Sequence, residues 1–223
     1  MFAGAWLPGL DGVQNLAVFV GAGLLLNLTP GADVALIAAR SAGQGVRAGV
    51  AAALGVGAGC GLHALAAALG LSALVAGSPW AFAALRWAGA AYLVWLGWCM
   101  LRARAAPRVA SEPASPTGAP SSFGRVFLQG FWTNALNPKV VMFFLAFVPQ
   151  FVRADTPHAA WSFALLGLIF SVNGTLVNLG FAVVLATLRQ RLGAGGRWGT
   201  WLGRGTGAVL VALGLKLALG DRV

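Results

Sequence analysis

The sequence predicts an all-α integral membrane protein in which six transmembrane helices form two inverted three-helix repeats, with helices 1 and 4 broken at a proline. Apolar residues make up 59% of the 223 and charged residues 9%, and the mean hydropathy is +0.81. A soluble domain of this length could not bury so much apolar surface. The apolar residues also form six segments long enough to cross about 30 Å of hydrocarbon as helices. These segments are residues 13–39, 48–71, 80–101, 126–152, 161–188 and 198–219.

The first span, 13–39, is interrupted by the run Asn27-Leu28-Thr29-Pro30-Gly31. Proline removes a backbone donor and frees the carbonyl one turn earlier, and hydrocarbon offers no water to satisfy that carbonyl. Such a break survives only where protein or a wet cavity covers it, so we expect a broken helix whose second half begins near Gly31. Residues 1–12 lack a basic stretch, and no cleavable signal peptide is expected.

Glycines recur at four-residue spacing in the second span, as the pairs Gly55/Gly59 and Gly57/Gly61. This spacing permits close contact between helices in a membrane, and we expect packing rather than chemistry there. The third span follows a Gly-Ser-Pro turn and contains Arg86, so a tilted or partly re-entrant course stays open.

Residues 102–125 form the longest connection between spans and are rich in Pro, Ala and Ser. They contain too few large apolar residues to fold alone, so we expect a flexible cytoplasmic linker. The linker separates a first repeat, 1–101, from a second repeat, 126–223. Because each repeat has three spans, the second enters the membrane with the opposite orientation, which makes the repeats inverted.

The fourth span, 126–152, contains a second polar break, Asn134-Ala135-Leu136-Asn137-Pro138-Lys139. Interrupted apolar segments at matching positions of two chain halves are the strongest sequence indication of a transporter's binding site. Alignment of Pro30 with Pro138 shows little other similarity between the halves. The repeat is therefore predicted from the breaks and from the number of spans.

The orientation is predicted from the arginines beside the connections. Ten of them follow the first, third and fifth spans, whereas the other side offers Arg153, Arg222 and Lys216. The positive-inside rule places the ten-arginine side in the cytoplasm and both termini outside. The same clustering explains the net charge of +10 without a basic face for nucleic acid. The ten are Arg40, Arg47, Arg102, Arg104, Arg108, Arg125, Arg189, Arg191, Arg197 and Arg204.

Each break is expected to expose backbone groups at membrane depth. A half-helix that begins near Gly31 or Lys139 has free N–H groups and the positive end of a helix dipole, which attract anions. The carbonyls freed before Pro30 and Pro138 can accept from an ammonium group. Two facing breaks can therefore hold both ends of a zwitterion such as an amino acid, and the chain is predicted to be a small-solute transporter.

Asp33 is the only acid within the predicted spans, and it lies in the first turn of the half-helix after the first break. Its burial costs roughly 2.5–3.5 kcal/mol on insertion scales. Three roles stay open: Asp33 can bind a substrate ammonium group, carry a coupling proton, or cap the half-helix. Lys139 needs an anionic neighbour, either a substrate carboxylate or Asp33, unless its side chain snorkels to an interface.

Further polar residues are candidates for binding solute or coupling transport. His63 can relay protons, with a hydrogen-bonded packing role as the alternative. Thr175 and Asn178 share one helix face and Asn173 points elsewhere, and either direction can line a cavity or bond between helices. At the breaks, four side chains can satisfy backbone groups and also face solute. These four are Asn27, Thr29, Asn134 and Asn137.

The motifs around the two breaks are similar to those of one family. The first reads Thr29-Pro30-Gly31-Ala32-Asp33 and continues with ARSAGQGVRAG, and the second reads Asn137-Pro138-Lys139 and leads through FFLAF to Pro149-Gln150-Phe151. With the chain length and the mid-chain linker, they resemble the LysE-type amino-acid exporters, also called lysine and threonine/homoserine exporters, of bacterial inner membranes. That family usually has Pro-Gly-Pro at the first break. Ala32 replaces the last proline here, which predicts a slightly less rigid half-helix start.

The resemblance implies a secondary transporter that exports an amino acid or a close derivative from the cytoplasm, driven by proton antiport. It implies no enzymatic step and no cofactor, and a multi-pass location in the bacterial inner membrane. The amino-acid substrate and the lipid bilayer are the expected partners, nucleic acid is not expected, and a homodimer stays open.

Two other classes compete with this interpretation. A metal-ion or other cation exporter of related architecture would need about four to six oxygen, imidazole or thiolate ligands. The spans hold one acid, one histidine and two separated cysteines, so no metal site is expected. A membrane enzyme or thiol-electron carrier would need paired cysteines or a nucleophile beside a base. Cys60 and Cys99 lie on different spans, where buried packing explains them.

Overall fold

The computed structural model describes residues 9–29, 31–78, 121–153 and 155–192, with single residues or pairs between 80 and 102. Pro30, the sixth predicted span, most of the third span and nearly all of the linker lie outside the described residues. Every named element in the described part is helical, and the one extended contact there is an antiparallel bridge between Val13 and Val152. The predicted all-α class is confirmed for this part of the chain.

The first half begins with two helices that are separated at the first predicted break. α1 spans Leu16–Leu28 and α2 spans Ala32–Gln44, and the two are bent by 51° with respect to each other. α3 (Val46–Ala66) continues through a π-helical turn, Ala67–Leu71, into α4 (Ser72–Gly77). A bend of this size at a break between two apolar helices fits a broken span, as the proline run predicts, or a re-entrant loop.

The second half repeats this pattern. α6 (Phe123–Ala135) and α7 (Pro138–Met142) are separated at the second predicted break. α7 continues as a π-helical turn, Phe143–Phe147, and a 3-10 turn, Val148–Phe151, and the bend between the two parts is 47°. α8 then runs as one helix over Ala159–Leu192.

Two stretches are long and apolar enough to cross a membrane without a break, Val46–Leu74 and Ala159–Thr187, and each bent pair adds one more span if it is counted as one. These four correspond to the predicted first, second, fourth and fifth spans. Both unbroken stretches expose large apolar side chains, as a lipid environment requires. These exposed side chains include Leu62, Leu65, Leu69, Leu168, Leu176 and Val183. The membrane class is supported, and the arrangement of six spans in two repeats stays a prediction.

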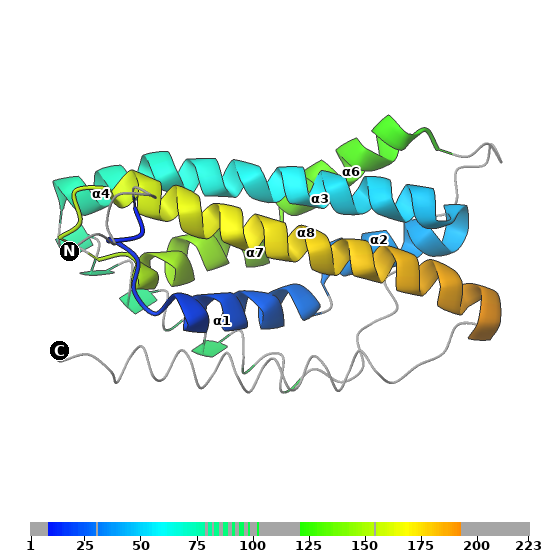
Figure 1. Cartoon of the computed structure of the whole chain (residues 1–223), viewed down its shortest axis with the longest axis horizontal. Coiled ribbons are helices and arrows are strands. Elements are labelled where there is room, and N and C mark those ends of the chain that lie inside the picture. Colours follow the sequence, from blue (N-terminus) through cyan, green and yellow to red (C-terminus); the bar gives the residue numbers. More distant parts are fainter. Residues whose placement is uncertain are drawn as a thin grey trace, which may run out of the picture.

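α3 lies against α6, α8 and α2, and α8 runs between α3 and α1 in the view of Figure 1. A Cβ at Gly55 would overlap with the carbonyl of Phe127, and one at Gly59 would lie 2.6 Å from the α6 backbone. A Cβ at Gly57 would overlap with a side chain of α8. Only Gly61 of the four faces open space. The predicted packing role is therefore confirmed for three of the four glycines.

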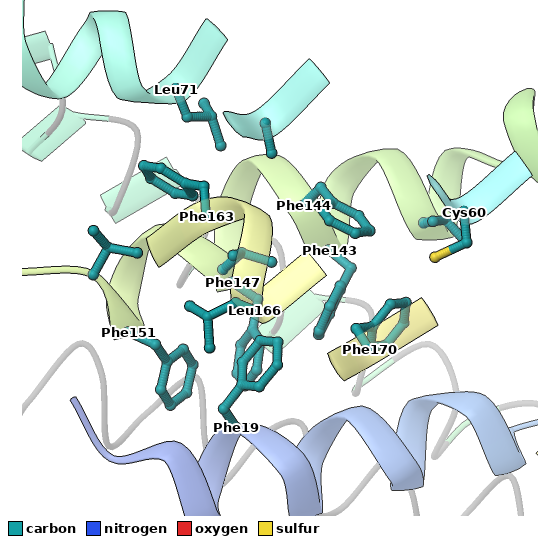
Figure 2. Close-up of a cluster of buried hydrophobic side chains, with 14 of the residues drawn as sticks. Phe19, Cys60, Leu71, Phe143, Phe144, Phe147, Phe151, Phe163, Leu166 and Phe170 are labelled. Atoms are coloured by element: carbon teal, nitrogen blue, oxygen red, sulfur yellow. The ribbon is translucent and has the colours of Figure 1, made fainter. Parts of the chain in front are cut away.

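A cluster of phenylalanine rings fills the space between α1, α8 and the π-helical turn after α7 (Figure 2). Phe19 reaches from α1 to Phe151, with ring centroids 5.2 Å apart, and Phe143 stacks on Phe170 of α8 at 4.2 Å. Stacked and edge-on rings contribute about 0.5–1.5 kcal/mol each beyond their buried area. The aromatic cluster thus fastens the first half of the chain to the second.

Described residues beside two of the connections predicted to be cytoplasmic contact one another: Gln44 Nε2, at the end of α2, donates to Ser121 Oγ, just before α6, at 3.4 Å. Arg40, near the end of α2, donates through Nε and Nη2 to Oε1 of Gln129 on α6, at 3.0 and 2.6 Å. At the opposite end, the segment before α1 pairs with the end of the second broken helix, where Gln14 N donates to the Phe151 carbonyl at 2.9 Å. The orientation of the chain in the membrane stays a prediction.

Replacement of Gly55 by valine should force α3 and α6 apart, because the new side chain would meet the Phe127 carbonyl. We expect a loss of about 1–3 kcal/mol in stability, which is the usual cost of overpacking. Thermal unfolding of the purified protein in detergent measures it. Gly61→Val is the matched control, with an expected change within about 0.5 kcal/mol. Equal unfolding temperatures for the two variants would contradict this packing.

The orientation is tested by fusing alkaline phosphatase, which is active only outside the cytoplasm, after different residues. Fusions after Asp155 and after residue 223 should be active, and a fusion after residue 115 should be inactive, because the arginine-rich connections stay in the cytoplasm. Enzyme activity normalised to fusion protein level is the measurement. The reverse pattern would overturn the orientation.

Candidate functional site

A cavity of about 30 Å³ lies where the two helix breaks meet. A volume of this size has room for about two water molecules. Polar side chains from both breaks, one face of α8 and several apolar side chains form its walls. The lining residues are Leu26, Asn27, Thr29, Gly31, Asp33, Val34, Val56, Gly57, Cys60, Asn134, Lys139, Val140, Phe170, Ser171, Gly174, Thr175 and Asn178. Most of the site residues predicted from the sequence are therefore brought together here.

Asp33 connects the first break to the second. It lies in the first turn of α2, and its Oδ2 accepts from the Nδ2 atoms of Asn134 and Asn137, each at 3.0 Å. Its other oxygen, Oδ1, is buried and has no hydrogen-bond partner among the described residues. The side chain is thus directed at the other half of the chain, and no bond from it caps its own helix within the part described.

The two half-helices begin differently. At the start of α7, Asn137 Oδ1 accepts from Lys139 N at 3.0 Å, and Pro138 occupies the first position, where no N–H is needed. At the start of α2, the cap residue is Gly31, and no side chain accepts from the first amides. Gly31 and Asp33 both line the cavity. The uncapped start of α2 is therefore the one that can attract an anion into the cavity.

Lys139 reaches from the second break to the first. Its Nζ donates to the carbonyl of Leu26 at 2.8 Å and to that of Thr29 at 3.2 Å. Asp33 attracts the ammonium group electrostatically, although its oxygens are not within 4.0 Å of it. The side chain lines the cavity and lies at the break, so it does not snorkel to an interface.

His63 lies behind the second break. Its Nε2 is 3.1 Å from the Asn134 carbonyl, which can only accept, so this nitrogen carries the proton that is donated. The ring also stacks on Phe144, with centroids 5.9 Å apart. His63 is not part of the cavity wall. This geometry fits the hydrogen-bonded packing role, and an amide that carries no transferable proton separates His63 from Asp33.

Both carbonyls freed by the prolines are occupied. In each break the residue before the proline donates its N–H to the carbonyl four residues before the proline, from Thr29 to Leu26 at 3.2 Å and from Asn137 to Asn134 at 2.9 Å. The lysine and histidine contacts give each carbonyl a second donor. These carbonyls are therefore not open to solute in this conformation, contrary to the sequence-based expectation, because side chains from other helices reach them.

Four buried polar atoms on the cavity walls have no hydrogen-bond partner within the described part of the chain. They are Nδ2 of Asn27, Oδ1 of Asp33, Oδ1 of Asn134 and Oγ of Ser171. An unpaired buried polar group costs about 1–3 kcal/mol, so such atoms indicate a place for a polar ligand or water. A Cβ at Gly174 of α8 would lie 3.0 Å from the Asn27 Oδ1, so the glycine leaves room for this amide.

α8 turns one polar face to the cavity. Thr175 and Asn178 lie on it, as their shared face predicted, whereas Asn173 does not line the cavity. Ser171 and Gly174 lie on the same face of α8, but neither was among the site residues predicted from the sequence. Their spacing of three and four residues is the signal that could have found them.

Cys60 is buried on the cavity wall, as expected for a small hydrophobic residue, and Cys99 lies outside the described residues. The residues that the structure describes contain no group of three or more His, Cys, Asp and Glu side chains that could hold a metal ion.

An ion pair occurs at the surface, away from the cavity. Arg153 Nη2 lies 2.8 Å from Asp155 Oδ2 in the connection before α8. The hydrogen bond and the charge of Arg153 hold the pKa of Asp155 below its ordinary value, and the same contact raises the pKa of Arg153. Both side chains are exposed, so the pair contributes little to stability.

Comparison with known proteins finds several efflux and membrane proteins of similar sequence. A homoserine/homoserine lactone efflux protein of Salmonella typhimurium is 34% identical over 197 residues, which cover 87% of this chain and 91% of the relative. A leucine efflux protein of Salmonella choleraesuis is 31% identical over 70% of this chain and 71% of the relative. An uncharacterized membrane protein of Pseudomonas aeruginosa is 31% identical over 93% and 96%.

No solved structure gives a significant match. A family profile described as LysE type translocator matches residues 24–221, a range that contains both helix breaks and the whole cavity wall. The chain belongs to the LysE type translocator family.

Proposed function

We propose that this chain is a secondary transporter that exports an amino acid or a close derivative from the cytoplasm across the bacterial inner membrane. The efflux proteins named for homoserine, homoserine lactone and leucine support the substrate class. The observation that carries the proposal is the set of unpaired buried side-chain atoms around one cavity: two acceptor oxygens, one amide donor and one hydroxyl. A metal-ion exporter has no comparable support, since the described residues lack a cluster of metal ligands.

The substrate's ammonium group binds the two free acceptors, Oδ1 of Asp33 and Oδ1 of Asn134. Both atoms are buried and unpaired, and both residues line the cavity. A hydrogen bond to a charged group is worth about 1.5–3 kcal/mol, and an ammonium group offers three donors. The second oxygen of Asp33 keeps its bonds to the second break, so the carboxylate is held in position for this contact.

The substrate's carboxylate binds Asn27 Nδ2. This atom is an unpaired buried donor on the described walls, the Ser171 hydroxyl is a second one, and the first amides of α2, whose start lines the cavity at Gly31, have no side-chain cap. An uncapped helix start adds the positive end of the helix dipole, which favours an anion. The substrate side chain then faces α8, where Thr175 and Asn178 suit a hydroxyl and Phe170 suits an apolar group.

Transport requires this cavity to widen and to open to each side of the membrane in turn. At about 30 Å³ it has room for water and not for an amino acid. Phe170 is both a wall of the cavity and a member of the aromatic cluster, where it stacks on Phe143. Movement of one broken helix relative to α8 would separate these rings and enlarge the site.

Proton antiport follows from competition for one carboxylate. The same Asp33 oxygen that binds the substrate's ammonium group can take up a proton when the substrate leaves, so each ligand displaces the other. In each cycle Asp33 carries substrate outward, binds a proton once the substrate has left, and releases that proton to the cytoplasm when the next substrate binds.

Replacement of Asp33 by asparagine keeps the shape of the side chain and removes its charge and its proton. We expect uphill, pH-driven efflux from proteoliposomes to fall at least tenfold, with protein level and unfolding temperature close to those of the wild type. Efflux of radiolabelled homoserine and leucine is the measurement. Asp155→Asn, which alters an exposed surface acid, is the matched control and should transport normally.

Solute–solute exchange separates the two roles of Asp33. A variant that has lost only the coupling proton should still exchange labelled for unlabelled substrate, whereas loss of the ammonium ligand should weaken exchange and binding together. Normal uphill efflux by Asp33→Asn would show that the carboxylate serves neither role.

Replacement of Pro138 or Pro30 by alanine restores a backbone N–H that can donate four residues back and favours a continuous helix. We expect normal insertion with efflux reduced at least tenfold, because the cavity depends on the break. Pro157→Ala, in the exposed connection before α8, is the control for loss of a proline alone. Wild-type efflux by a well-folded variant lacking both Pro30 and Pro138 would contradict a role for the breaks.

A further inference from the structure

Each helix break leaves one backbone carbonyl without the N–H donor that a residue other than proline would supply. A different kind of side chain donates to this carbonyl in each break. Pro30 and Pro138 lack the N–H that would donate to the carbonyls of Leu26 and Asn134. At the second break, an imidazole nitrogen of His63 meets the carbonyl, and a neutral ring can serve. At the first break, the donor is the ammonium group of a lysine.

The lysine contact resembles a bound cation more than an ordinary cap. The Lys139 Nζ lies between two backbone carbonyls at the end of α1, that of Leu26 in the last turn at 2.8 Å and that of Thr29, just after the helix, at 3.2 Å. Carbonyls at the C-terminal ends of half-helices and in unwound segments coordinate coupling cations in transporters with broken helices. The negative charge of Asp33, on the first turn after the same break, attracts the ammonium group. A free cation at this place would find the same ligands.

We propose that Lys139 is a resident cation of the first break: its tethered ammonium group fills a cation site made by the Leu26 and Thr29 carbonyls, and its removal exposes that site to a free ammonium ion. The proposal rests on the function proposed above and assigns Lys139 a positioning role, because its ammonium group holds the end of α1, which carries Asn27, and the residue that follows it toward Asp33. It also explains why these carbonyls do not receive the substrate's own ammonium group.

One consequence concerns the driving ion. Because the position is filled by a group of the chain itself, export should need no sodium or potassium ion. Efflux from proteoliposomes should therefore proceed at the same rate when these salts are replaced by choline chloride of equal ionic strength.

The test uses purified full-length protein with Lys139→Ala, which removes the ammonium group and leaves space for a small ion. We expect its Tm to fall by roughly 5–10 °C, because carbonyls and a carboxylate are left without their cation. Ammonium or methylammonium chloride should restore at least half of this loss, whereas choline chloride, which has no N–H donor, should restore none. Lys139→Met is the matched control, since its side chain fills the space and should prevent recovery by any salt.

Exchange of labelled amino acid in proteoliposomes gives the second readout. Lys139→Ala should lose at least tenfold in exchange rate and regain it with methylammonium, and Lys139→Met should not regain it. Recovery of Tm by ammonium in a protein whose wild type exchanges no amino acid would support the cation site and overturn the proposed transport function. A wild type that exchanges normally, together with a Lys139→Ala variant of wild-type Tm and rate, would overturn the cation site alone. Recovery of the Lys139→Ala Tm by choline to the same extent as by ammonium would also overturn the cation site.

Lys139→Arg keeps the comparison decisive if Lys139→Ala does not fold. Arginine retains the positive charge and lysine-like reach, whereas methionine retains only the size. A lower Tm for Lys139→Met than for Lys139→Arg supports a resident cation, and equal values overturn it.

Discussion

The rest of the structure depends on one constraint: a backbone carbonyl inside a membrane protein needs a donor, and each proline removes one. The structure meets this need with side chains from elsewhere in the fold. Lys139 of the second break covers the Leu26 carbonyl of the first, and His63 of α3 covers the Asn134 carbonyl of the second. The breaks are therefore stable only when the two halves are packed together. The hydrogen bonds from Lys139 and His63 to these carbonyls also join one half of the chain to the other.

The same contacts decide which polar atoms are left for a solute. Asn134 and Asn137 hold one oxygen of Asp33 and leave the other free, and the lysine and histidine contacts occupy the freed carbonyls. Four side-chain atoms stay unpaired on the described walls, and the first amides of α2 have no side-chain cap. A site built in this way is preorganised, because its polar groups are held by bonds that do not involve the ligand.

The α3–α6 contact and the aromatic cluster, which both lie beside the cavity, differ in how tightly they are packed, and this difference determines which helices can move. Glycines of α3 bring it against α6 with almost no space between the backbones, so these two helices form a firm unit. The aromatic cluster beside the cavity is held by ring contacts, and it contains a π-helical turn at Phe143–Phe147. π-helical turns often occur at functional sites, and this one lies between the second break and the rings that stack on α8.

The sequence by itself determined the membrane class, the positions of both breaks and most of the polar residues that line the cavity, because hydropathy, proline chemistry and the cost of a buried acid act locally along the chain. Helical spacing likewise predicted that Thr175 and Asn178 share a face. The sequence could not show that Asp33 accepts hydrogen bonds from the amides of the other break, or that Lys139 and His63 donate to the freed carbonyls. It also could not show that Gly174 makes room for Asn27. Only the tertiary structure decided these, because each depends on the distance between groups far apart in the chain, and that distance is set by how the helices pack.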